Sequence, residues 1–241
     1  MNKRAPMNRI LSIDLEPRLD LPLFQGPRWL PDGTPFVSVK ACKEPIPDSC
    51  EGFSHIILSG STCSILDTAP FLEPAMALVR DAVRLGRPIL GICYGHQLAV
   101  RALLGPDHVQ RSPVPEIGWL PISAESGHDT LFAGLPDPFY AFVGHFDEVC
   151  NLPDDWEITA STAGCPIQGV LNRRQRIIGF QFHPEMDLRV GNSCYHTNRE
   201  ALARLGFNVD FIIAQSQEDG SGKLLIPRFL SRQWWEPESP Q

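Results

Sequence analysis

The chain has 241 residues, of which 43% are hydrophobic and 20% are charged. This composition supports a substantial core and excludes a disordered chain. The formal net charge of −7 excludes the basic surface with which proteins neutralise phosphates, so we expect no nucleic-acid partner. No apolar run approaches the ~20 residues that span a bilayer, and the basic N-terminus lacks the apolar core of a signal peptide. We therefore expect a cytoplasmic protein without a membrane partner.

Seven cysteines are spread irregularly along the chain, and no two of them form a CxxC pair. The spacing gives no support for a zinc ribbon or a thioredoxin-type redox site. Free cysteine is among the most buried residue types, so we expect most of these thiols to fill the core in reduced form. We expect no metal and no cofactor. The cysteines are Cys42, Cys50, Cys63, Cys93, Cys150, Cys165 and Cys194.

The first half of the chain alternates predicted strands with predicted helices. The segment 88–92 is apolar throughout, which is typical of a strand that is buried on both faces. The apolar residues of 73–86 recur with helical spacing, and Gly86 provides a stop signal. Predicted strands span 9–14, 36–42, 56–60 and 88–92, and predicted helices span 73–86 and 95–105.

The second half consists mainly of short extended pieces joined by turns, which indicate antiparallel strands attached to one side of the sheet. A helical pattern follows over 197–217, where Gly206 should interrupt it. Together the two halves predict an α/β fold: an open, mostly parallel sheet with helices on both faces and a small antiparallel addition. The extended pieces span 116–123, 141–149, 156–163, 167–172 and 177–183.

Cys93 lies where the strand 88–92 turns into the helix 95–105, with Gly91 and Gly95 on either side. A sharp strand-to-helix turn places its corner residue at the ligand-binding edge of an open sheet, and small neighbours let the backbones pass closely. The helix N-terminus favours a thiolate, and the amide of Tyr94 would face a developing oxyanion. Two interpretations remain open at this point, a nucleophile and a structural thiol packed between glycines.

A cysteine nucleophile needs a base, and His183 is a candidate. It ends the β-prone run 177–182 and is followed by Pro184 and Glu185. A carboxylate two residues after the histidine can orient the ring, as in a catalytic triad. The alternative is a surface histidine or a satisfied core histidine, but the strand-end position and the neighbouring acid favour the catalytic interpretation.

Five segments, in this order, carry a resemblance to a known family. They are HIILSGS (55–61), GICYGHQ (91–97), EIGWLPI (116–122), VGHFDEV (143–149) and GFQFHPE (179–185). The set resembles the signature motifs of class I glutamine amidotransferases over roughly 9–185. It is most similar to free-standing members that resemble the amidotransferase domain of GMP synthase. The resemblance implies a flavodoxin-like fold in one domain, 1–241.

The resemblance also implies a role for each matching residue. The nucleophile is Cys93, the general base and acid is His183, and the residue that orients His183 is Glu185. The backbone donors of the oxyanion hole are Gly60 and Tyr94, and the substrate-binding residues are Gln97, His145 and Asp147.

The chain departs from the family pattern in three places. Ser61 and Thr62 replace the second glycine and the proline of the usual GGP loop, Gly144 replaces a serine, and Phe146 replaces a small residue. In addition, an insertion at about 186–221 separates Glu185 from an expected C-terminal helix at about 222–235. The insertion could cap the active site, bind a partner, mediate self-association or simply add a packed helix.

The leading hypothesis is hydrolysis of the glutamine side-chain amide through a γ-glutamyl thioester, with ammonia passed to a separate synthase subunit. The alternative is a γ-glutamyl peptidase or hydrolase that acts on γ-glutamyl peptides or conjugates without a partner. A third possibility is a non-catalytic binding protein on the same fold, which the intact set Cys93, His183 and Glu185 disfavours.

Overall fold

A single mixed sheet runs through the protein and positions the site. The computed structural model describes residues 9–17, 30, 33–125 and 129–231. The strands of these residues are β1 (Arg9–Asp14), β2 (Phe36–Lys40), β3 (Phe53–Leu58), β4 (Ile89–Ile92), β5 (Val109–Ala124), β6 (Phe139–Val149), β7 (Glu157–Ser161), β8 (Gly169–Asn172) and β9 (Ile177–Phe180).

The strand order within the sheet is β2-β1-β3-β4-β9-β8-β7-β5-β6. The pairs β1–β2, β1–β3, β3–β4 and β4–β9 are parallel, whereas β8, β7, β5 and β6 join by antiparallel pairing. The predicted parallel sheet with an antiparallel addition is therefore confirmed, and the addition contributes four strands. The placement of β9 beside β4 matters most, because it returns the chain to the middle of the sheet.

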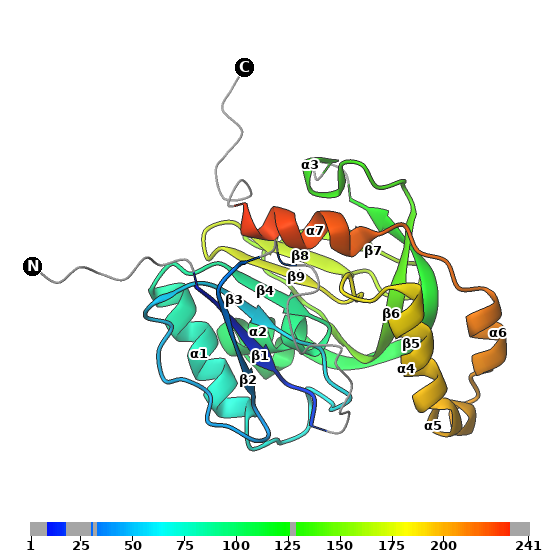
Figure 1. Cartoon of the computed structure of the whole chain (residues 1–241), viewed down its shortest axis with the longest axis horizontal. Helices are drawn as coiled ribbons and strands as arrows, with labels where there is room; N and C mark the ends of the chain where they lie inside the picture. The colour runs from blue at the N-terminus through cyan, green and yellow to red at the C-terminus, as the bar shows by residue number, and fades with distance from the viewer. Residues whose placement is uncertain (1–8, 18–29, 31–32, 126–128, 232–241) are drawn as a thin grey trace, which may run out of the picture.

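Helices cover both faces of the sheet, as predicted (Figure 1). On one face α1 and α2 pack against each other, and on the other face α7 lies across the central strands. Three short helices, α4 to α6, lie beyond β5 and β6. The helical elements are α1 (Leu72–Arg84), α2 (Tyr94–Leu104), η1 (Pro106–His108), α3 (Asp129–Phe132), α4 (Leu188–Thr197), α5 (Arg199–Arg204), α6 (Val209–Ala214) and α7 (Ser221–Leu230).

The two-residue period of the strands divides the core into two layers. On β4, Ile89 packs with residues of α1 and α2, whereas Leu90 and Ile92 belong to the cluster that contains Phe229 of α7. All four residues of β4 are buried, in agreement with the apolar character of the segment. A strand buried on both faces is the central element from which the site projects.

The predicted elements differ from the structure mainly after residue 185. Helix α4 was not predicted as a separate element. It follows the N-cap Asp187, whose carboxylate accepts a hydrogen bond from the Val190 amide at 2.8 Å. The predicted helical stretch is divided into α5 and α6 around Gly206, whose φ of +90° ends the first helix. Helix α7 begins at Ser221 and ends at Leu230, and residues 232–235 of the expected C-terminal helix lie outside the described residues.

In the part of the chain that the structure describes, no helix has both the length and the apolar character needed to cross a bilayer. The longest run of helix, α1, has 13 residues.

Candidate active site

The cysteine corner predicted from the sequence is present at the end of β4. Cys93 has φ +49° and ψ −106°, a strained conformation for a residue with a side chain, and it caps the N-terminus of α2. Its amide donates a hydrogen bond of 2.7 Å to the Phe180 carbonyl of the neighbouring strand β9. The strained turn fixes the direction of the sulfur at the carboxyl edge of the parallel strands, as in a nucleophile elbow.

Close backbone packing behind the corner requires glycine. A Cβ atom on Gly91 would lie 2.6 Å from the Gly95 carbonyl oxygen, and one on Gly95 would collide with the Leu58 carbonyl of β3. The ring of His96 lies against Gly179 of β9 in the same layer. His96 is fully buried, and burial lowers its pKa to about 3, so this ring is a neutral packing group. The glycines around Cys93 therefore set how closely α2 approaches the sheet.

His183 reaches Cys93 because the two follow neighbouring parallel strands. Cys93 comes directly after β4, and His183 comes shortly after β9. The His183 amide donates to the Phe142 carbonyl at 2.9 Å, and this bridge ties the segment after β9 to β6. The ring nitrogen Nδ1 lies 2.7 Å from Oε1 of Glu185, and both side chains are buried. Nε2 is the other ring nitrogen of His183, and Cys93 is close enough to affect the charge of the ring.

The charge of His183 follows from these neighbours. Burial by itself would lower the pKa of the imidazole, but the negative charges of Glu185 and of the Cys93 thiolate outweigh burial and raise it to about 10. An imidazolium at this position holds a proton that a leaving group can take. The two motifs that supplied Cys93, His183 and Glu185 are thus brought together as one buried cluster.

The loop after β3 approaches the corner through a fixed backbone. The Ser59 hydroxyl donates to the Gly60 carbonyl at 2.8 Å and accepts from the Leu15 amide at 2.8 Å. The Gly95 amide donates to the Ser59 carbonyl at 3.0 Å, which joins the loop to α2. Gly60 is buried, and the residues of this loop that line the adjoining cavity are those that follow it, 61–64.

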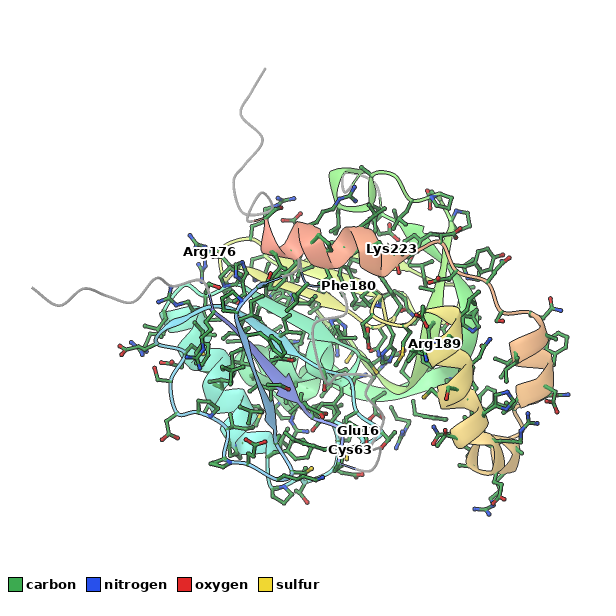
Figure 2. The ribbon with its side chains drawn as sticks, viewed as in Figure 1. Glu16, Cys63, Arg176, Phe180, Arg189 and Lys223 are labelled. Carbon is green, nitrogen blue, oxygen red and sulfur yellow. The ribbon has the colours of Figure 1, made fainter. Side chains whose placement is uncertain are left out.

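Glu16, which the sequence analysis did not select, secures the same loop. Its carboxylate accepts two hydrogen bonds from Thr62, 2.5 Å from the amide and 3.0 Å from the hydroxyl. Glu16 and Cys63 lie close together beyond the ends of β1 and β3 (Figure 2). Where the family usually has a proline, this chain has a threonine that a buried carboxylate holds by side-chain and backbone bonds. Glu16 lies two residues beyond the end of β1, and the sequence around it carries no signal that distinguishes it from the neighbouring acid Asp14.

Asp147 also binds the loop rather than projecting freely into the cavity. Its Oδ2 accepts from the Ser64 hydroxyl at 2.6 Å and from the Ile65 amide at 3.0 Å, and its Oδ1 pairs with Arg111 at 2.9 Å. Asp147 lines the cavity. In this structure, however, its carboxylate ties β6 to the loop that follows β3, so its contact with substrate remains a prediction.

Gln97 lies inside the site and is bound to other buried groups. Its Nε2 donates to the Asp147 carbonyl at 2.7 Å and to Oε1 of Gln181 at 2.9 Å. Gln181 in turn places its Nε2 3.5 Å from the Cys93 sulfur. The sequence analysis did not select Gln181. The available signal was a lone amide in an otherwise apolar run immediately before His183, because buried polar groups require partners.

A cavity of about 410 Å³ opens in front of Cys93 and His183. Its walls include Gln97, His145 and Asp147, three of the residues predicted to bind substrate, together with Phe146. The structure adds a wall that the motifs do not contain, because α4, α5 and the residue after α5 close one side. The residues of this wall are Cys194, Tyr195, Asn198, Ala201, Leu202 and Leu205.

The same segment packs around His183. The ring of Phe142 meets His183 edge to face at 5.3 Å and 89°, and Tyr195 of α4 stacks on Phe142 at 4.5 Å. The Tyr195 hydroxyl donates to the Val143 carbonyl at 2.8 Å. Trp119 packs against the edge of Phe142 at 5.6 Å. Aromatic contacts from β5, β6 and α4 therefore hold one face of His183.

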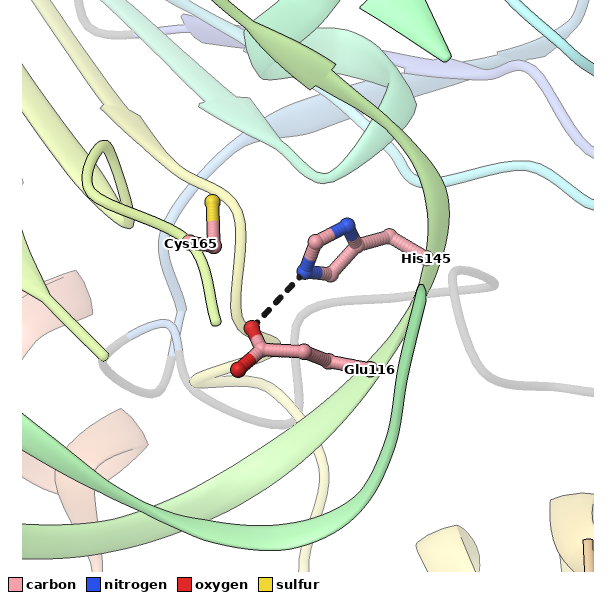
Figure 3. A group of neighbouring side chains, drawn as sticks. All are labelled: Glu116, His145 and Cys165. Atoms are coloured by element: carbon pink, nitrogen blue, oxygen red, sulfur yellow. Dashed lines mark hydrogen bonds and ion pairs between the residues drawn. The ribbon is translucent and has the colours of Figure 1, made fainter. Parts of the chain in front are cut away.

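The described residues contain one buried group with metal-ligand chemistry, formed by Glu116, His145 and Cys165 (Figure 3). Their ligand atoms lie within 4.8 Å of one another. The His145 ring has an acceptor at each nitrogen, Glu116 Oε2 at 3.1 Å from Nε2 and the Asp147 carbonyl at 3.1 Å from Nδ1. Gln168 donates a further bond of 2.6 Å to the Glu116 carboxylate.

These hydrogen bonds account for the group without a metal. Burial opposes ionisation of Glu116, but bonds from His145 and Thr162 outweigh it and lower the pKa of the carboxyl. Burial raises the pKa of the Cys165 thiol to about 12, and its sulfur bonds to the Ile167 carbonyl at 3.5 Å, so it is a poor source of thiolate. The group is a buried network that fixes β5 to β6. It also orients His145, whose contact with substrate remains a prediction.

Comparisons with known proteins agree with this geometry. The family model described as glutamine amidotransferase class-I matches residues 36–200. The glutamine-hydrolysing GMP synthase of Syntrophomonas wolfei is 39% identical over 132 residues, which are 54% of this chain and 24% of that protein. The GMP synthase of Lactobacillus gasseri is 36% identical over 154 residues, 64% of this chain and 27% of that protein. The chain thus spans about a quarter of the length of these curated relatives.

Solved structures show the same fold over nearly the whole chain. A glutamine amidotransferase from Thermotoga maritima superposes with a TM-score of 0.76 at 22% identity, covering 97% of this chain and all of that one. A glutamine amidotransferase from Methylobacillus flagellatus has a TM-score of 0.74 at 20% identity, covering 98% and 99% of the two chains.

Proposed function

The chain belongs to the class I glutamine amidotransferase family, and from this premise we propose that it hydrolyses the side-chain amide of glutamine through a γ-glutamyl thioester on Cys93. The observation that carries the proposal is the arrangement around the sulfur. A strained cysteine corner, a buried His183–Glu185 pair at 2.7 Å and a helix N-terminus all meet at one end of a cavity. Each of these features favours a thiolate nucleophile with a proton donor beside it.

In the first half of the reaction, the thiolate of Cys93 attacks the amide carbon and forms a carbon–sulfur bond. The carbonyl electrons move onto oxygen, and the backbone amides of Gly60 and Tyr94 are the proposed donors to this oxyanion. When the intermediate collapses, the carbon–nitrogen bond breaks. The departing nitrogen takes the proton from Nε2 of His183, so ammonia leaves and the thioester remains. Loss of one oxyanion donor typically costs about 100- to 1,000-fold in rate.

In the second half, a water molecule gives a proton to His183, which is now neutral, and its oxygen attacks the thioester carbon. The carbon–sulfur bond breaks, glutamate leaves, and the thiolate–imidazolium pair is restored. Glu185 keeps the same ring orientation through both halves, since its bond is to Nδ1. Gln97, His145 and Asp147 are the proposed substrate-binding residues, because all three line the cavity.

For the fate of the ammonia, we propose transfer to a separate synthase subunit. The support is the similarity to GMP synthases, of which this chain matches only about a quarter. A glutaminase that works with a synthase should hydrolyse glutamine slowly alone and faster with its partner.

One observation favours a second candidate function, hydrolysis of γ-glutamyl peptides or conjugates. The amine leaves on the side of His183, and there α4 and α5 wall a cavity of about 410 Å³. Leu202 and Leu205 contribute apolar surface to this wall. This space would accommodate a substituent on the amide nitrogen, which glutamine does not have.

The nucleophile is tested with the glutamine analogue 6-diazo-5-oxo-norleucine, followed by mass spectrometry of the intact protein and its peptides. We expect one adduct, on Cys93. The Cys93→Ala variant should remain folded, take up no label and lose hydrolysis. Cys42→Ala, which removes an exposed cysteine outside the cavity lining, is the matched control and should label normally. Wild-type hydrolysis by Cys93→Ala would exclude the proposal.

The two substrate classes are separated by comparing kcat/KM for glutamine with kcat/KM for γ-glutamyl peptides such as glutathione. Preference for glutamine supports the amidotransferase function, whereas preference for the peptides supports the second candidate.

A further inference from the structure

Gln181 is a completely buried amide between β9 and His183. Its backbone is fixed, because its amide donates to the Gln168 carbonyl at 2.8 Å. Burying a carboxamide is costly unless its donors and acceptor are paired, so the partners of this side chain indicate what it does there. Those partners are Gln97 on one side and the Cys93 sulfur on the other.

A backbone carbonyl determines which end of the Gln181 amide faces the sulfur. The Asp147 carbonyl can only accept, so Gln97 must present its NH₂ group to it, at 2.7 Å. The same NH₂ group then donates to Gln181 at 2.9 Å, which requires the oxygen of Gln181 at that position. The remaining end of Gln181, its own NH₂ group, faces Sγ of Cys93 at 3.5 Å. The direction of every bond follows from the first acceptor.

The second polar neighbour of the sulfur has the opposite effect. The Gly144 carbonyl oxygen lies 3.8 Å from Sγ, where it can accept a hydrogen bond from a thiol but would repel a thiolate. An amide N–H that points at the sulfur favours the charged form. Gln181 therefore offsets Gly144, and it does so whether or not His183 carries its proton.

We propose that Gln181 is a catalytic residue of this site, which stabilises the Cys93 thiolate through the hydrogen bond that it donates to the sulfur. Gln97 is the positioning residue that keeps the donor end of Gln181 toward Sγ. The proposal rests on Cys93 as the nucleophile of the proposed function. It adds a neutral donor, from the strand end that also supplies His183, to the groups that activate the sulfur.

The test measures the thiolate directly and does not require turnover. The rate at which iodoacetamide alkylates Cys93 is followed from pH 4 to 10 in the full chain, with the modified peptide quantified by mass spectrometry. Gln181→Met keeps the length of the side chain but removes the donor. We expect the apparent pKa of Cys93 to rise by about 1 to 2 units, because a hydrogen bond to a charged group is lost. Alkylation below the wild-type midpoint should fall about tenfold or more.

Cys42 provides an internal control, since it is exposed and its alkylation profile should not change. Gln181→Asn is the second variant, for the case that Gln181→Met does not fold. It keeps the amide but withdraws it by one methylene, and it should raise the pKa in the same direction. An unchanged Cys93 profile in either folded variant would overturn the proposal.

Gln181 could act on Cys93 directly or only through His183. To separate the two, the Gln181 variants are compared again in a His183→Gln background. If Gln181 acts on the sulfur itself, removing its donor still raises the pKa of Cys93 when the imidazole is absent. If the effect disappears there, Gln181 only positions His183 and the proposal is wrong. Failure of the proposed function is recognised differently, by glutamine hydrolysis that persists in Cys93→Ala.

Discussion

The two parts of the sheet build the site by different means. The parallel part consists of β2-β1-β3-β4-β9 with α1 and α2. It positions Cys93 through close contacts between backbone atoms. The antiparallel part, together with α4 and α5, supplies side chains that pack around His183 and line the cavity. Cys93 belongs to the first part, and most of the cavity wall belongs to the second.

In the parallel part, the corner at Cys93 forms because nothing larger than hydrogen fits at Gly91 and Gly95. The resulting geometry has few alternatives, since backbone atoms cannot be repacked as side chains can. In the antiparallel part, Phe142 and Tyr195 hold His183 by ring contacts, and Glu116 holds His145 by a buried hydrogen bond. Side-chain contacts of this kind can adjust in small steps when one residue is substituted.

This difference indicates where reaction and specificity are encoded. The proposed reaction depends on the positions of Cys93 and of the proposed oxyanion donors Gly60 and Tyr94, which the parallel part of the sheet provides. The size and polarity of the substrate depend on the wall from α4 and α5, which packs through side chains. A chain could therefore keep thioester chemistry while its substrate changes. The following predictions test this comparison, from the largest expected effect to the smallest.

The largest effect is expected from Gly95→Ala in the parallel part. The added methyl group would collide with the Leu58 carbonyl, so either α2 or β3 must move. We expect a loss of about 3 kcal/mol or more in the free energy of unfolding, measured by urea denaturation. Gly52→Ala is the control. It has φ +83° but nothing within 4 Å, so only backbone strain of about 1 kcal/mol applies. Equal costs for the two variants would contradict the close-packing argument.

An intermediate effect is expected from Glu185→Gln, which changes charge at nearly constant shape. The Glu185 carboxylate helps to raise the pKa of His183 to about 10, so its loss should lower that pKa. Hydrolysis requires the imidazolium as acid and declines as the pH rises through this pKa. The alkaline limb of the pH–rate profile should therefore move to lower pH, by about 1 to 3 units.

Glu157→Gln serves as the control for this shift. Glu157 of β7 pairs with Arg173, which follows β8, and both side chains are substantially exposed. Its profile should match that of the wild type. An alkaline limb that does not move in Glu185→Gln would show that another group sets the charge of His183.

The smallest effect is expected from Tyr195→Phe in the antiparallel part. The ring stacked on Phe142 remains, whereas the hydroxyl's 2.8 Å bond to the Val143 carbonyl and its bond with the Gly118 backbone are lost. We expect a loss of about 1 kcal/mol in the free energy of unfolding, with the pH–rate profile unchanged. A larger loss, or a displaced profile, would mean that this part of the site is as intolerant of change as the cysteine corner.

Much of the catalytic cluster could be predicted from the sequence. The strand, the flanking glycines and the helix around Cys93 are local features, and a β-prone run ended by His183 and Glu185 is equally local. Gln181 and Glu16 are different, because a polar residue in or near an apolar strand does not show which residue is its partner. Helix α4 was missed because its role depends on contacts with β5 and β6 rather than on its own pattern.

By itself, the sequence determined the alternation of strands and helices, the corner at Cys93 and the family resemblance carried by five ordered motifs. Only the tertiary structure decided that β9 lies beside β4, which brings Gln181 and His183 to a cysteine about ninety residues earlier in the chain. It also decided that α4 and α5 close the cavity. The reason is physical: local periodicity reflects the backbone geometry of one element, whereas strand order and cavity walls reflect packing between elements far apart in the sequence.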